Sequence, residues 1–113
     1  MILLNAFSAN MLTDFPVSIR FAEITAAEAR HHLMCAAEAD GEAECIRSAV
    51  GHADTAAVFG EVLNVPVPCR RETVTLQRGQ RAIIGQYSGP RLPEGATSLP
   101  EGASIKWLVI SIE

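Results

Sequence analysis

The stretch ETVTLQRGQRAIIGQYSGPRLPEGATSLPEGASIKWLVISI, residues 72–112, decides the fold class because its apolar residues follow the spacing of strands. Two short runs, ETVTLQ (72–77) and RAIIGQY (81–87), flank the turn RGQ and are predicted to form a β-hairpin. A loop rich in glycine and proline follows this hairpin. The run IKWLVISI (105–112) is then predicted to form the last strand.

The residues before this stretch carry helical signals instead. The segment TAAEARHHLMCAAEA (25–39) is rich in Ala and Glu, and Thr25 with Glu28 forms a capping box at its start. Two further helices are predicted, EAECIRSAV (42–50) and DTAAVFGEVL (54–63). Helices therefore occupy the middle of the chain.

Two more strands are expected near the N-terminus. The apolar run ILLNAF (2–7) predicts a central strand, and Ser8 is a candidate N-cap for a brief helical turn after it. FPVSIRFAEI (15–24) alternates apolar and polar residues, as an outer strand would. The order of elements predicts a single α+β domain over residues 1–113, with a mixed sheet of about five strands and its helices mainly on one face.

The composition narrows the class of protein before any motif is considered. Hydrophobic residues make up 49% of the 113 residues, which predicts a compact folded chain. Charged residues make up only 19%, and the formal net charge is −4. Non-specific binding to nucleic acid depends on many Lys and Arg contacts to phosphate, so we expect no long DNA or RNA partner. An anionic ligand is expected to be small and to meet a few focused basic groups.

Cysteine usage and the opening residues indicate where the protein works. Cys35, Cys45 and Cys69 are an odd number at wide spacing without a C-x-x-C motif, which fits a reduced, cytoplasmic protein better than a disulfide framework. The opening MILLNAF is too short to span a membrane and lacks the basic region and cleavage site of a signal peptide. We therefore expect a cytoplasmic protein without a membrane partner.

One histidine stands between two predicted helices, in VGHADTA at residues 50–56. Gly51 ends the first helix, and the next one opens at Asp54 or Thr55. His52 is therefore expected at a helix N-terminus, where exposed amides favour anions and disfavour an extra positive charge. Such a place suits a group that donates a proton near neutral pH. The alternative is a histidine that only hydrogen-bonds a neighbouring loop.

Arg91 and Glu94 lie in a loop between two predicted strands, where proline and glycine fix the backbone. A planar Arg fork held in such a loop is suited to bind phosphate, and the alternative is a solvated turn in which Arg91 pairs with Glu94. The sequence LPEGA occurs twice, at residues 92–96 and 99–103. It is predicted to form two related turns rather than a functional duplication.

Polar residues near strand ends supply further candidates. Ser8 and Asn10 follow the first strand, where loops often present ligand-binding side chains, although Ser8 also fits a simple helix cap. Gln86 is unusual because it interrupts an apolar strand, and a buried amide needs hydrogen-bond partners. Arg70 and Arg71 precede the predicted hairpin, and they either bind an anion or protect an edge strand by their charge.

Metal ligands are sparse in the sequence. His32 and Cys35 lie one helical turn apart, near His31 and Glu38, but they have no clear partner pair elsewhere. Zinc sites need three or four converging ligands, so an ordinary helix surface is expected here. We expect no metal and no other cofactor.

Three motifs occur together in a fixed order, NAFSANML at 5–12, VGHADTA at 50–56 and GPRLPEG at 89–95. In these motifs, and over nearly its whole length, the chain resembles the ring nucleases of the viral anti-CRISPR type and their cellular relatives. That family degrades cyclic tetra-adenylate, the second messenger of type III CRISPR defence, and its members are described as symmetric homodimers. The resemblance therefore implies cyclic tetra-adenylate as the ligand and a homodimer as the working form.

The resemblance also implies roles for individual residues. His52 matches the catalytic histidine, and Arg91 and Glu94 match its catalytic partners. The ligand-contacting positions of the family fall on Ser8, Asn10, Gly51, Arg71 and Gln86. After Glu94 the chain has SLPEGAS where the family has a helix-like stretch, so Glu101 is a second candidate acid.

The implied activity is metal-independent cleavage of the ring to linear di-adenylate with a 2′,3′-cyclic phosphate. The ribose 2′-OH would attack the phosphorus, and His52 would act as general acid. Two other classes of protein are considered. One is a non-catalytic dimeric binding protein that sequesters cyclic oligonucleotides or binds nucleic acid or protein. The other is a metal-dependent phosphodiesterase, whose usual density of carboxylates and histidines the sequence lacks.

Overall fold

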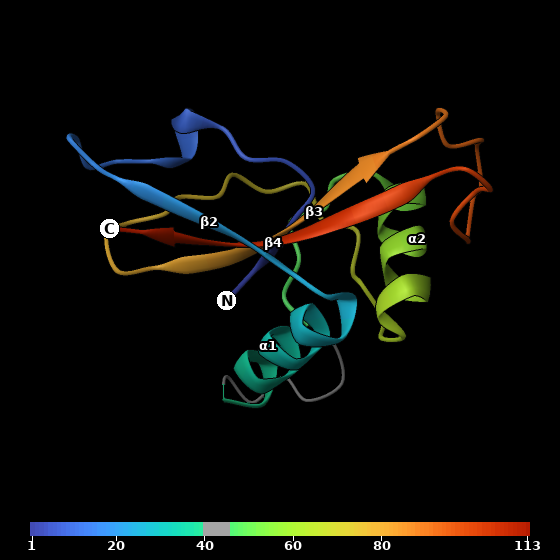
Figure 1. Cartoon of the computed structure of the whole chain (residues 1–113), viewed down its shortest axis with the longest axis horizontal. Helices are drawn as coiled ribbons and strands as arrows, with labels where there is room; N and C mark the ends of the chain where they lie inside the picture. The colour runs from blue at the N-terminus through green and yellow to red at the C-terminus, as the bar shows by residue number, and fades with distance from the viewer. Residues whose placement is uncertain (40–45) are drawn as a thin grey trace.

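The fold is built on a four-stranded mixed sheet in which the strands lie in the order β1, β3, β4, β2 (Figure 1). The computed structural model describes residues 1–39 and 46–113. The strands are β1 (Leu3–Leu4), β2 (Ile19–Ile24), β3 (Arg81–Ser88) and β4 (Ser104–Ile112). β1 is parallel to β3, whereas β3 and β2 both run antiparallel to β4. The predicted α+β class is therefore confirmed, with four strands in place of about five.

Three helical elements accompany the sheet in the described residues: η1 (Ala9–Met11), α1 (Ala26–Ala39) and α2 (Ala53–Leu63). The capping box expected before α1 is present, because the N–H of Thr25 donates to Glu28 Oε1 at 3.1 Å. The N–H of Glu28 donates in return to Thr25 Oγ1 at 3.1 Å. Ser8 caps η1 by accepting a hydrogen bond from the N–H of Asn10 at 3.3 Å. Both helix starts therefore follow from local sequence signals.

Both α-helices cover the same face of the sheet, as the sequence predicted. The hydrophobic cluster on this face joins Leu3 and Ile83 of the sheet to Leu33 of α1 and Phe59 of α2. All four side chains are almost completely buried. Burial of this apolar surface is the main force that holds the helices against the sheet.

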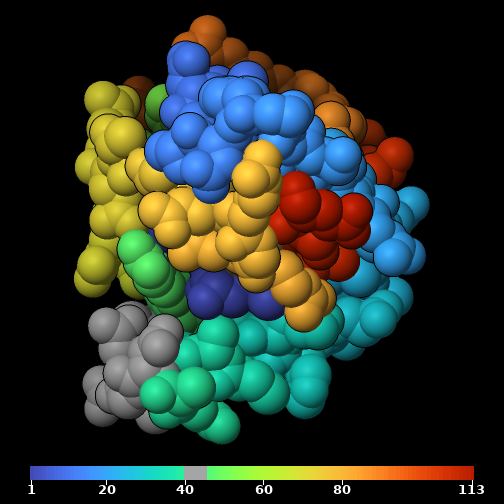
Figure 2. Space-filling model, turned by 90° about the vertical axis from the view of Figure 1, so that its left-hand side faces the viewer, coloured from blue at the N-terminus to red at the C-terminus, as the bar shows by residue number. Residues whose placement is uncertain are grey.

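The opposite face of the sheet is covered by loop segments. Its cluster includes Ile84 and Ile110 of the sheet together with Leu12 and Leu76. Leu12 and Leu76 also form a parallel β-bridge, so two loops that are far apart in sequence lie side by side. Figure 2 shows the surface of this region, where the blue residues before β2 lie against the yellow-orange residues before β3.

Gly85 of β3 allows α2 to approach the sheet closely. The rings of Phe59 and Trp107 pack edge to face with their centroids 5.1 Å apart. A Cβ atom at Gly85 would lie 2.7 Å from atoms of both rings, a distance that real Cβ atoms do not adopt. The glycine therefore sets how closely α2 approaches the sheet, and with it the position of the helix N-terminus.

The helix predicted over residues 42–50 is wrong in its described part. Residues 46–50 are extended, because the N–H of Leu3 donates to the carbonyl of Arg47 and the N–H of Ala49 donates to the carbonyl of Leu3, both at 3.0 Å. Burial alternates along this segment with the period of two that is typical of a strand. Residues 42–45 lie outside the described residues.

The hairpin predicted between residues 72–77 and 81–87 is also wrong. β3 has β1 on one edge and β4 on the other, so neither edge is open to residues 72–77. The true hairpin partner of β3 is β4, in a continuous register that ends with Ser88 opposite Ser104. The glycine- and proline-rich loop 89–103 therefore joins two neighbouring strands.

Candidate functional site

His52 lies at the N-terminus of α2, as the sequence predicted. It is the N-cap residue, and its carbonyl oxygen accepts a hydrogen bond from the N–H of Ala56 at 2.9 Å. Its side chain is exposed and makes no capping hydrogen bond. The imidazole is therefore available to a ligand beside the first amides of the helix, which favour anions.

An open cavity of about 950 Å³ is lined by His52, Arg91 and Glu94 together. We call it the Arg91 pocket. Its wall also includes Asp54 and Tyr87. The fold thus brings together the three residues for which the sequence resemblance implied catalytic roles, one from the start of α2 and two from the loop after β3.

Two hydrogen bonds fix the loop 89–95 at its two ends. The Tyr87 hydroxyl donates to the carbonyl of Pro90. At the far end, the N–H of Gly95 donates to Asp54 Oδ1 at 3.0 Å. Because Asp54 belongs to the first turn of α2, the second bond holds the loop beside the helix, where Figure 1 shows it at the end of the sheet.

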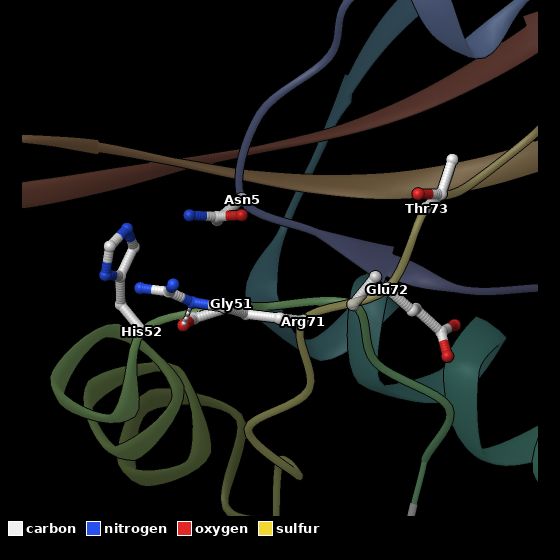
Figure 3. Close-up of a pocket in the computed structure, with 7 residues that line it drawn as sticks. Asn5, Gly51, His52, Arg71, Glu72 and Thr73 are labelled. Carbon is white, nitrogen blue, oxygen red and sulfur yellow. Dashed lines mark hydrogen bonds between the residues drawn. The ribbon is translucent and has the colours of Figure 1, made fainter.

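A second cavity, of about 450 Å³, also has His52 in its wall, and we call it the Arg71 pocket (Figure 3). Arg71 Nε donates to the carbonyl oxygen of Gly51 at 3.2 Å. Figure 3 shows the Arg71 guanidinium, the His52 imidazole and the Asn5 amide gathered at one end of the pocket. The Glu72 carboxylate points away from them. This arrangement offers an anion several donors, from which the carboxylate of Glu72 is turned away.

Asn5 is a pocket residue that the sequence analysis did not single out. It follows β1 directly, lines the Arg71 pocket, and also lines a second groove together with Gln86. A polar residue placed immediately after a buried strand was the signal that could have identified it. Its amide can both donate and accept hydrogen bonds, as recognition of a nucleotide requires.

Three of the predicted ligand-contacting residues line neither of the two pockets that have His52 in their wall. Ser8, the N-cap of η1, and Asn10 within η1 are exposed and line neither of the two pockets. Ser8 makes the capping hydrogen bond, and the ligand contacts of both residues stay a prediction. Gln86 is exposed rather than buried, and it lines the groove that also holds Phe7 and Phe21. Its amide therefore needs no buried partner, contrary to the sequence argument.

Metal-ligating side chains do not converge in the part of the chain that the structure describes. No three His, Cys, Asp or Glu residues there lie close enough together to hold a metal ion. His31 and Cys35 contact each other on α1, with Nε2 3.8 Å from Sγ, and Cys35 and Cys69 are free thiols. None of the described helices combines the length and the apolar character needed to cross a membrane.

The fold and site define a small α+β protein whose open site lies where a helix N-terminus meets the loop of a β-hairpin. Residues 1–105 match the STIV B116-like family, and the chain belongs to that family. B116 of Sulfolobus turreted icosahedral virus is similar in structure, with a TM-score of 0.78 and 26% sequence identity over 97% of both chains. A comparison with curated proteins finds no match. The expected kinship with viral proteins is thus confirmed at the level of family and fold.

Proposed function

We propose that this protein is a metal-independent ring nuclease that cleaves cyclic tetra-adenylate to linear di-adenylate with a 2′,3′-cyclic phosphate. The observation that carries the proposal is the presence of His52, Arg91 and Glu94 in the wall of one pocket. A proton donor, an anion stabiliser and a carboxylate are the groups needed when RNA is cleaved by its own 2′-OH. Removal of the messenger would switch off the ancillary effectors of type III CRISPR defence in the cytoplasm.

The proposed reaction needs one proton donor at the leaving oxygen. The ribose 2′ oxygen forms a new bond to phosphorus as its proton passes to Glu94 or to solvent water, and the bond from phosphorus to the 5′ oxygen breaks. His52, in its protonated form, gives its proton to that 5′ oxygen. Its place at the N-cap of α2 leaves the exposed imidazole accessible to a bound ligand.

Arg91 and Glu94 act on the charge that develops at phosphorus. The guanidinium of Arg91 neutralises the additional negative charge of the five-coordinate phosphorane, as Arg does in other phosphoryl transfers. Glu94 either orients Arg91 or assists in removing the 2′ proton. Both residues stand on the loop 89–95, which is held beside α2 by the Asp54 hydrogen bond.

The working form is proposed to be a homodimer with the ring across its two-fold axis. His52, Arg71, Arg91 and Glu94 are all exposed in one chain, whereas electrostatic catalysis is strongest where water is excluded. A second copy facing the first would enclose the site and offer the same residues to each half of a symmetric ring. Two copies of Arg71 and two of Arg91 would then offset the four phosphates, although the chain carries a net charge of −4.

The proposal is tested by incubating the protein with labelled cyclic tetra-adenylate and excess EDTA and resolving the products by chromatography. We expect linear di-adenylate with a cyclic phosphate. A deoxyadenylate ring of the same size is the matched control, and it should remain intact because it has no 2′-OH. An intact ribose ring that co-elutes with the protein would indicate the sequestering class instead. An intact ring that does not bind would contradict both classes.

A further inference from the structure

The repeated sequence LPEGA forms two copies of the same turn. In the first, the N–H of Ala96 donates to the carbonyl of Pro93 at 3.1 Å, and in the second, the N–H of Ala103 donates to the carbonyl of Pro100 at 3.1 Å. The glycines have matching φ angles, 79° at Gly95 and 80° at Gly102. Glu94 and Glu101 therefore occupy equivalent places in two matching turns. Local conformation alone does not decide which of them is the functional acid.

The two turns differ in what holds them. The N–H of Gly95 donates to Asp54 Oδ1 at 3.0 Å, whereas no side chain among the described residues accepts a hydrogen bond from the N–H of Gly102. Glu94 lies in the wall of the Arg91 pocket and Glu101 does not. The Asp54 hydrogen bond is thus the contact that distinguishes the first turn from its copy.

Packing gives the tip of the turn little support. A Cβ atom built at Gly95 or at Gly102 would meet no other atom within 4 Å, so both turns project from the body of the protein. A hydrogen bond to an ionised carboxylate is stronger than one between neutral groups, and it can restrain a segment that side-chain packing does not. Without this loop, Asp54 would be expected to face the N–H groups at the start of α2, because acidic side chains in the first turn of a helix are stabilised by those groups.

We infer that Asp54 is a positioning residue that holds the first LPEGA turn, the one that carries Glu94, beside the start of α2. The inference rests on the proposed ring-nuclease function. Asp54 acts through the N–H of Gly95, next to Glu94, and takes no part in the chemistry itself. It couples the helix that carries His52 to the loop that carries Arg91, across a separation of 41 residues between Asp54 and Gly95.

The experiment compares Asp54→Ala with Asp54→Asn, which keeps the Oδ1 acceptor. Two readouts are used: hydrogen exchange of the Gly95 amide by NMR, with Gly102 as an internal control, and steady-state cleavage of cyclic tetra-adenylate. In Asp54→Ala we expect Gly95 to exchange about tenfold faster and kcat to fall about tenfold with a smaller change in KM. Asp54→Asn should restore most of both, and Gly102 should not change in either variant. Retained amide signals of β3 and β4 would show that the variants fold.

Glu94→Gln and Glu101→Gln form a second matched pair, because the two glutamates have the same local conformation. We expect Glu94→Gln to slow cleavage by at least tenfold and Glu101→Gln to leave it unchanged. Equal losses in the two variants would contradict the proposed role of Glu94, and unchanged Gly95 exchange and kcat in Asp54→Ala would overturn the inference. If the wild-type protein leaves the ring intact, the proposed function fails and the assignment of Glu94 fails with it. Gly95 exchange would still show whether Asp54 holds the loop.

Discussion

Arg71 donates a hydrogen bond through Nε to the carbonyl oxygen of Gly51 at 3.2 Å, and Gly51 is the residue immediately before His52. The aliphatic part of the Arg71 side chain also lies close to Gly51, since a Cβ atom at Gly51 would be 3.0 Å from Cγ of Arg71. The bond uses one of the guanidinium nitrogens and leaves the two terminal ones for a ligand. Arg71 is therefore held with its fork directed into the Arg71 pocket.

Replacement of Arg71 by lysine should weaken binding of the ring by about tenfold, although the charge is kept. A lysine has one nitrogen, which cannot both replace the Nε contact to Gly51 and present a fork to phosphate. Affinity is measured by calorimetry in a His52→Ala background, so that the ring stays intact. Arg70→Lys is the matched control, because Arg70 is exposed and lines neither pocket. Equal affinities for Arg71→Lys and its parent would mean that only the charge is used.

Replacement of His52 by alanine should leave binding of the ring largely intact and slow its cleavage by about 10²–10⁴-fold, the usual contribution of a general acid. The imidazole makes no capping hydrogen bond, so its loss should not unfold the start of α2. Single-turnover cleavage and equilibrium binding are measured on the same preparation. His31→Ala, which removes an exposed histidine from α1, should cleave at the wild-type rate. Normal cleavage by His52→Ala would remove this residue from the mechanism.

The fold was predictable where short-range chemistry determines it and not where strand partners do. The start of α1 follows from Thr25 and Glu28, three residues apart, because each satisfies the other's backbone. Residues 46–50 depend instead on Leu3, whose backbone groups pair with them from far away in the sequence. The Ala- and Glu-rich neighbours of this segment favoured a helix, and the long-range pairing overrode that preference. The partner of β3 was missed for the same reason.

The residues of the site were likewise predictable where local sequence positions them and not where long-range contacts do. The position of His52 at a helix N-terminus was predictable from the helical residues after it, although Gly51 follows an extended segment and not the helix that was expected before it. Arg71 was a candidate by its charge, but its bond to Gly51 spans 20 residues and has no local signature. The bond from Gly95 to Asp54 spans 41 residues, and only the folded chain shows which of the two LPEGA turns it selects.

Gly85→Ala should destabilise the protein by about 1–3 kcal/mol, the usual cost of adding a methyl group to a filled core. The new Cβ would lie 2.7 Å from ring atoms of Phe59 and Trp107, and neither ring can move without disturbing the packing of α2 against the sheet. Urea unfolding measures the change. In a Phe59→Leu background the same substitution should cost less, because the ring on one side is gone. An unchanged cost in that background would place the strain elsewhere.

Glu28→Gln should reveal a pH-dependent contribution of the capping box to stability. The backbone N–H of Thr25, and after it the Thr25 hydroxyl, lower the pKa of the Glu28 carboxyl from its usual value of 4.5. A carboxyl group whose pKa is lower in the folded than in the unfolded state stabilises the fold above the unfolded-state pKa, and this stability is lost as the pH falls through the folded-state pKa. Glutamine keeps a neutral acceptor at the same position, so the variant removes only the charge.

The stability difference between the wild type and Glu28→Gln should therefore be constant near neutral pH and should shrink as the pH falls below 4.5. Thermal unfolding of both proteins across this range measures it. Thr25→Ser keeps the backbone N–H and the hydroxyl, and it should follow the wild type at every pH. A difference that persists undiminished in acid would mean that Glu28 stabilises α1 through contacts that do not depend on its charge.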